Sequence, residues 1–231
     1  KHEYRADHFA GRFWIRTNKD ATNFKLMSTP EDKTAIENWQ DIVPHSDDEY
    51  FEEFQLFDGH LATRLRRNGL TEIRFRELGK KAWQSLEFHD PTYQAFLAAT
   101  DQPNTVWLRY AYESLTTPRS FYERNMRTGE IRLLKEHEIL GGFDRRNYKS
   151  ERRLVTARDG TKVPVSLVYH NDTQLDGTAP CLLYGYGSYG YSIDASFNPS
   201  LLNLLDRGFV YAIGHIRGGQ ELGRQWYEDG K

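Results

Sequence analysis

The 231-residue sequence has one cysteine and almost no excess charge of either sign. A single cysteine, Cys181, excludes a framework of internal disulfides and fits a reducing compartment, so we expect a cytoplasmic protein. Cys181 lies in an apolar run, which predicts a buried thiol rather than a reactive one. The net charge is -2, so no overall basic excess attracts nucleic acid. We interpret the local basic cluster of Arg64, Arg66 and Arg67 as solvated surface.

Long hydrophobic runs and clusters of metal ligands are also missing. No stretch approaches the roughly 18 apolar residues of a membrane-spanning helix, so we expect no membrane contact. The eight histidines are scattered and form no metal-binding pattern, and we expect neither a metal nor another cofactor. Residues 1–4 show no signal-peptide pattern and no initiator methionine, so we expect an excised segment of a longer protein.

Aromatic residues are abundant instead. The chain has 14 Tyr, 13 Phe and 5 Trp, and aromatic side chains favour the pleated surface of a β-sheet. Three units repeat at a spacing of about 45 residues, and each reads as four short strands, as a β-propeller blade does. The first two units align at residues 11–17 and 59–65, and the third begins near Thr105.

Alternation within the units supports strands. Ile73 and Phe75 are apolar, whereas the neighbouring Arg74 and Arg76 are charged. We therefore expect residues 1–140 to form about three β-propeller blades, with further blades upstream because three cannot close a ring. A generic antiparallel sheet protein is the alternative.

The pattern changes after residue 140. A glycine pair at 141–142 predicts a linker, and we expect residues 141–231 to be the start of an α/β domain. The expected elements are a hairpin turning at Asp159-Gly160, a strand buried on both faces over 180–184, a helix over 199–207 and a second buried strand over 209–213.

The densest functional signal is the glycine- and tyrosine-rich segment 184–190, directly after the first buried strand. Glycines let the backbone approach a ligand, and ligands gather beyond the carboxyl ends of strands in α/β sheets. A tyrosine hydroxyl presented there can donate a hydrogen bond to developing negative charge. A tight loop plugged by aromatic rings is the alternative. The segment also matches a dinucleotide-binding fingerprint, but it lacks the surrounding βαβ unit.

A nucleophilic serine is not identified in this chain. The nucleophile elbow of hydrolases requires Gly-x-Ser-x-Gly, and neither Ser188 nor Ser192 satisfies it. His215 follows the second buried strand, and we interpret it as structural rather than as a catalytic base. We expect Arg217 and Glu221 to form an ion pair in the loop after that strand.

These segments resemble the prolyl oligopeptidase family of serine peptidases, and most closely its oligopeptidase B (protease II) branch. The resemblance covers essentially the whole chain. It rests on residues 183–190, 204–213 and 217–223, with further likeness at 112–118, 157–160 and 163–169.

The resemblance implies a seven-bladed propeller that caps an α/β-hydrolase domain, and hydrolysis of short peptides after Arg or Lys. Short basic peptides are then the substrates. It also implies that Tyr186 donates to the oxyanion hole and that Asp194 binds basic substrate residues. Two positions depart from the family's pattern: Ser196 replaces a second carboxylate, and Gln220 replaces a glycine.

The resemblance places the Ser, Asp and His triad beyond Lys231, so we expect this chain alone to be inactive. Its open sheet edges favour self-association. Two other interpretations remain: a non-catalytic propeller-type interaction module, and a different peptidase of the same family that acts as an acylaminoacyl- or dipeptidyl-peptidase.

Overall fold

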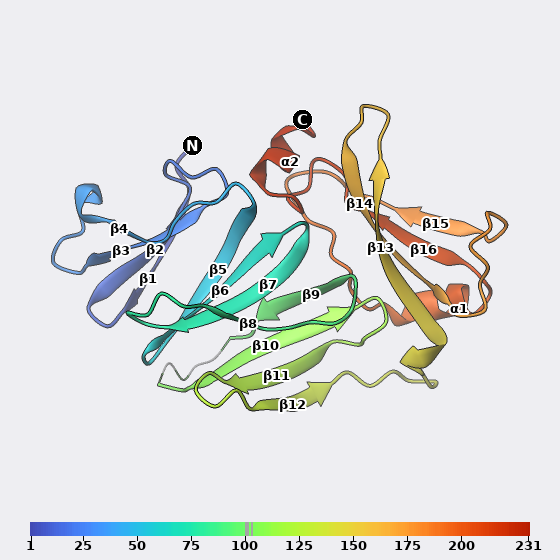
Figure 1. Cartoon of the computed structure of the whole chain (residues 1–231), viewed down its shortest axis with the longest axis horizontal. Helices are drawn as coiled ribbons and strands as arrows, with labels where there is room; N and C mark the ends of the chain where they lie inside the picture. Colours follow the sequence, from blue (N-terminus) through green and yellow to red (C-terminus); the bar gives the residue numbers. More distant parts are fainter. Residues whose placement is uncertain (100–101, 103) are drawn as a thin grey trace.

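The computed structural model describes residues 1–99, 102 and 104–231. Within these residues the chain forms four sheets of four strands each. Figure 1 shows the first three sheets side by side in blue to green, with the fourth sheet beyond them in yellow to red.

Each of the first three sheets is an antiparallel meander in which every strand pairs with the next one along the chain. The first contains β1 (Tyr4–Phe9), β2 (Arg12–Thr17), β3 (Lys25–Pro30) and β4 (Gln40–Val43), with the short 3₁₀ helix η1 (Ile36–Asn38) before β4. The second contains β5 (Glu49–Phe57), β6 (His60–Arg67), β7 (Leu70–Glu77) and β8 (Gln84–Ser85). The third contains β9 (Tyr93–Leu97), β10 (Trp107–Ser114), β11 (Ser120–Asn125) and β12 (Ile131–Glu136). The prediction of three blade-like units is confirmed.

The period-two pattern of β7 shows why these segments form strands. Thr71, Ile73 and Phe75 are buried, whereas Arg74 and Arg76 point to the other face and are half-buried. Successive side chains of a strand point to opposite faces, so this sequence can bury an apolar face only as a strand.

Hydrophobic cores lie between neighbouring sheets, as expected for propeller blades packed face to face. Trp14 and Leu26 of the first sheet pack with Phe51 and Leu61 of the second. A larger core joins the second and third sheets, and it includes Phe57, Phe75, Leu108, Tyr110 and Tyr112.

The fourth sheet is mixed. Its strands are β13 (Tyr148–Thr156), β14 (Lys162–His170), β15 (Cys181–Tyr184) and β16 (Val210–Gly214), in the order β13-β14-β16-β15. β15 and β16 are parallel, and the connection between them contains η3 (Pro199–Leu201) and α1 (Leu202–Leu205). The short helices η2 (Arg145–Asn147) and α2 (Arg224–Glu228) precede and follow this sheet. The expected order of hairpin, strand, helix and strand is thus present, with a shorter helix than predicted.

The prediction of a buried first strand is wrong. All four residues of β15 are exposed, and Cys181 is an exposed free cysteine rather than a core thiol. β15 is the edge strand of the sheet and pairs only with β16, whereas α1 packs against β14 and β16. An apolar run indicates that a strand should be covered, but it does not identify the segment that covers it.

Candidate functional site

The loop that follows β15 carries Tyr186. This residue is 47% exposed, and its ring meets the ring of Tyr191 edge-on with 6.2 Å between centroids. Both rings line a cavity of about 420 Å³, together with Tyr184, Tyr189, Gly190 and Ile193. Among the described residues, none makes a hydrogen bond to the Tyr186 hydroxyl, so this group can donate to a molecule bound in the cavity.

Two glycine-rich loops, which the sequence presents as separate signals, lie against each other. The backbone N–H of Gly190 donates to the carbonyl oxygen of Gly218 over 2.8 Å. A Cβ atom on Gly218 would lie only 2.0 Å from the carbonyl oxygen of Gly187. The loop after β16 therefore supports the backbone of the loop that carries Tyr186.

The expected ion pair between Arg217 and Glu221 is wrong. Arg217 Nη2 lies 2.6 Å from Asp159 Oδ2 in the turn between β13 and β14. Glu221 turns inward instead, and its Oε1 accepts a hydrogen bond of 2.8 Å from the backbone N–H of Ile193. Burial raises the pKa of Glu221. The two side chains leave the loop in different directions, because one anchors it to a surface turn and the other to the Tyr186 loop.

Asp194 is held by an arginine of the second sheet. Arg66 Nη1 donates to Asp194 Oδ1 over 2.6 Å, and Nη2 donates to Oδ2 over 3.2 Å. Two residues later, Ser196 Oγ accepts from Gln94 Nε2 over 2.6 Å. The assignment of Asp194 as a substrate-binding residue stays a prediction, and a basic side chain would meet a carboxylate that already has a guanidinium partner.

Arg66 is a functional candidate that the sequence did not indicate. The interpretation of its basic cluster as solvated surface is wrong for this residue, which is buried. Its partner lies 128 positions away along the chain, so no local pattern reveals the pair.

A buried polar chain runs from Thr92, the residue before β9, into the fourth sheet. Thr92 Oγ1 lies 2.5 Å from Ser166 Oγ, which lies 2.7 Å from His215 Nε2. His215 is buried, and its carbonyl oxygen accepts from Trp226 Nε1 over 3.1 Å. Burial, assisted by the positive charge of Arg152, lowers the pKa of His215 to about 4. These contacts support the structural interpretation of His215.

We expect the stability of the protein to fall between pH 6.5 and pH 4 through His215. In this window the unfolded state binds a proton at the ordinary pKa of 6.5, whereas the folded state keeps the imidazole neutral. The contribution of neutral His215 to the free energy of unfolding is therefore complete above pH 6.5 and is lost as the pH falls toward 4. The free energy of unfolding can be measured with urea at pH 7.5 and at pH 5.5. Its decrease between these two pH values should be about 1 kcal/mol larger for the wild type than for His215→Gln. Parallel pH profiles would contradict this assignment. The comparison also distinguishes the effect of His215 on stability from that of Glu221. The pKa of Glu221 is raised by folding, so its protonation makes the protein more stable as the pH falls.

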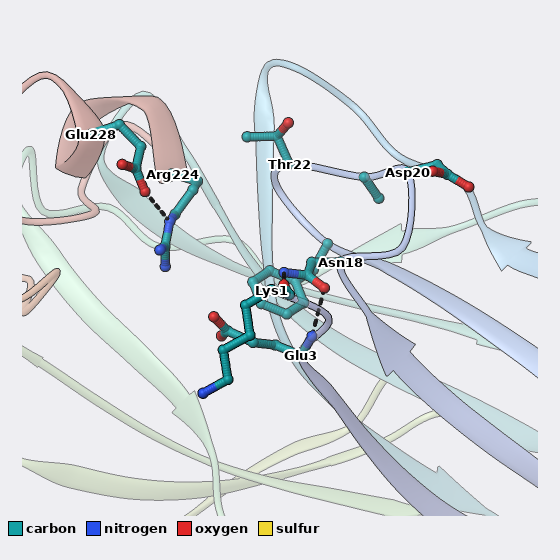
Figure 2. Close-up of a pocket in the computed structure, with 9 residues that line it drawn as sticks. Lys1, Glu3, Asn18, Asp20, Thr22, Arg224 and Glu228 are labelled. Carbon is teal, nitrogen blue, oxygen red and sulfur yellow. Dashed lines mark hydrogen bonds and ion pairs between the residues drawn. The ribbon is translucent and has the colours of Figure 1, made fainter.

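A second cavity, of about 440 Å³, lies between the first sheet and α2. Figure 2 shows Arg224 and Glu228 of α2 on one side and Glu3 and Asn18 on the other. Arg224 Nε donates to Glu228 Oε1 over 2.9 Å, and its backbone N–H donates to Asn23 Oδ1 over 2.9 Å. The cavity is therefore part of the junction between the blades and the C-terminal segment.

The described part of the chain contains no group of three or more side chains placed to hold a metal ion. Within the same residues, no helix has the length and apolar character needed to span a membrane.

Comparison with known proteins gives a family match and several relatives. Residues 1–137 match the family model of the prolyl oligopeptidase N-terminal β-propeller domain. The chain is 48% identical over 231 residues to dipeptidyl aminopeptidase BI of Pseudoxanthomonas mexicana, with 99% of this chain and 32% of that protein covered. It is 35% identical over 228 residues to protease 2 of Moraxella lacunata, again with 99% and 32% covered.

Among solved structures, oligopeptidase B from Leishmania major superposes with a TM-score of 0.91 at 35% identity. The superposition covers 99% of this chain and 33% of that chain. The chain therefore spans about a third of the length of the relatives it matches.

Proposed function

Because the chain belongs to the prolyl oligopeptidase family, we propose that it is a segment of a serine peptidase in which Tyr186 stabilises the oxyanion. The observation that carries this proposal is the Tyr186 hydroxyl, which has no hydrogen-bond partner in the described part of the chain and lies beside a cavity at the carboxyl end of β15. In the first step of peptide hydrolysis, negative charge develops on the carbonyl oxygen of the substrate. A hydroxyl already in place can donate to that oxygen and stabilise the transition state more than the ground state.

The proposal treats residues 1–140 as the last blades of the propeller and residues 141–231 as the start of an α/β-hydrolase domain. Two features support this division. The sheets before it are antiparallel, whereas the sheet after it contains the parallel pair β15 and β16. Parallel strands need a crossover connection, and α1 lies in the connection found here. The serine nucleophile and the rest of the triad are proposed to lie outside this chain.

The finer part of the proposal is cleavage of short basic peptides after Arg or Lys, in the cytoplasm, as by an oligopeptidase B. A dipeptidyl-peptidase activity is the second candidate, because the chain is 48% identical to a protein named dipeptidyl aminopeptidase. The exposed edge of β15 is the proposed route by which the isolated chain would self-associate.

A panel of three fluorogenic peptides tests these alternatives on the full-length protein that contains this chain. We expect turnover of an N-terminally blocked peptide with Arg before the scissile bond. Turnover restricted to a dipeptide with a free amino terminus would indicate a dipeptidyl-peptidase, and turnover of an acetylated amino acid would indicate an acylaminoacyl-peptidase. No turnover, together with no labelling by a fluorophosphonate, would indicate a non-catalytic interaction module.

The 231-residue chain alone should show no turnover in the same assay, because its sequence contains no Gly-x-Ser-x-Gly elbow. The assay should use refolded 231-residue chain. Circular dichroism should first show that this material has the mainly β-strand structure of Figure 1. Hydrolysis by this material would show that the nucleophile lies within these residues and would overturn the proposed division.

A further inference from the structure

The segment from Ile193 to Ser196, at the C-terminal end of the Tyr186 loop, is held at three points by three different elements. Glu221, after β16, accepts from the backbone N–H of Ile193. Arg66, on β6, donates to Asp194, and Gln94, on β9, donates to Ser196. Two of the three anchors thus come from blades rather than from the sheet that carries the loop.

Arg66 is the strongest of these anchors. It is buried, and its guanidinium binds two carboxylates: both Nη atoms reach Asp194, and Nε donates to Glu52 Oε1 over 3.0 Å. Burial by itself lowers the pKa of Arg66, but the charges of Glu52 and Asp194 raise this pKa overall, so the guanidinium keeps its positive charge although it is buried. A planar guanidinium that makes two parallel hydrogen bonds fixes the orientation of a carboxylate as well as its distance.

The anchored segment is continuous with the wall of the Tyr186 cavity. Ile193 lines this cavity with Tyr186 and Tyr191, and it immediately precedes Asp194. By contrast, the Tyr189 side chain at the tip of the loop is 87% exposed, and the backbone next to it is held by the hydrogen bond from Gly190 N–H to the Gly218 carbonyl oxygen. The position of the loop therefore depends on its anchors.

We infer that Arg66 is a positioning residue for Tyr186: it ties the Tyr186 loop to the second sheet through Asp194. This inference rests on the proposed function of Tyr186. It makes the placement of a hydrogen-bond donor on the fourth sheet depend on a side chain of a propeller blade. It also gives Asp194 an internal cationic partner where a basic substrate residue was expected.

The test uses Arg66→Met in the full-length protein, because methionine keeps much of the volume of the side chain and removes the charge. We expect kcat to fall about tenfold with KM little changed, since misplacement by about 1 Å can cost up to 10²-fold in rate. In a Tyr186→Phe background the same substitution should have no further effect, because Arg66 acts through Tyr186. Arg64→Met is the matched control: Arg64 lies on the same strand and pairs with Glu52 and Glu53. It should change kcat less than twofold.

Three results would overturn the inference. The first is an unchanged kcat for Arg66→Met, and the second is a full tenfold loss in the Tyr186→Phe background. The third is a lower KM of Arg66→Met for an Arg peptide, at unchanged kcat and with no change in KM for a neutral peptide. This result would mean that Arg66 competes with the basic side chain of the substrate for Asp194. If Arg66→Met does not fold, Arg66→Lys and Asp194→Asn take its place, since each removes the paired geometry and keeps a polar group.

The failure of the proposed function would be seen separately. In that case the wild type shows no turnover, or Tyr186→Phe leaves kcat unchanged. Failure of the positioning inference requires an active wild type and an impaired Tyr186→Phe protein, together with any one of the three results given above for Arg66→Met.

Discussion

Tyr186→Phe should lower kcat of the full-length protein about 10²–10³-fold and leave KM nearly unchanged. Phenylalanine keeps the ring that lines the cavity and its edge-on contact with Tyr191, and it removes only the hydroxyl. That hydroxyl has no partner among the described residues, so its removal leaves no buried group unsatisfied and should not destabilise the fold. The loss should therefore fall on the transition state, where the oxyanion needs a donor, rather than on substrate binding.

Tyr189→Phe is the matched control for this experiment. Tyr189 lines the same cavity but is 87% exposed, so the removal of its hydroxyl should change kcat less than twofold. Steady-state rates on a single fluorogenic peptide suffice for the comparison. Equal kcat values for Tyr186→Phe and the wild type would remove Tyr186 from the mechanism.

Gly218→Ala should destabilise the protein and lower kcat together. The residue has a φ of +98°, and a new Cβ would lie 2.0 Å from the carbonyl oxygen and 2.5 Å from the carbonyl carbon of Gly187. Both contacts are with backbone, so no side-chain rotation relieves them. We expect the free energy of unfolding to fall by about 1–2 kcal/mol because alanine disfavours this backbone conformation. It should fall by a further amount of about 1–3 kcal/mol because the new Cβ displaces the Gly187 backbone. Because Gly187 is adjacent to Tyr186, the displacement should also move the Tyr186 hydroxyl, the proposed oxyanion donor.

Gly208→Ala separates these two effects. Gly208 has a φ of +83°, and a Cβ at this position would meet nothing within 4 Å. We expect this variant to show the conformational cost alone, with kcat unchanged. Urea unfolding of the two variants gives the comparison, and equal losses of stability would show that the Gly218 contact with Gly187 is not tight.

The blades could be predicted because their signals are local. The alternation around Ile73 and Phe75 indicates a strand, and the repeat of similar units indicates sheets of the same size packed side by side. The Tyr186 loop was also visible in the sequence, because glycines clustered directly after an apolar run allow the tight turns and close backbone approaches that such a loop needs.

The errors in the prediction share one cause. The apolar run at Cys181 was expected to be buried, Arg217 was expected to pair with Glu221, and Arg66 was expected to be solvated. Each expectation used neighbours in sequence, whereas burial and pairing are determined by neighbours in space. β15 lies at a sheet edge, Arg217 reaches the turn at Asp159, and Arg66 reaches Asp194 from another sheet.

The sequence by itself determined the strand pattern, the blade repeat and the family resemblance, and through that resemblance it made Tyr186 a candidate, because each depends only on residue types and their order along the chain. Only the tertiary structure decided that the loops of Gly187 and Gly218 support each other, and that Asp194 has Arg66 as its partner. A hydrogen-bonded ion pair needs its atoms within about 3 Å, and the sheets that bring these atoms together are packed by cores whose residues lie far apart along the chain.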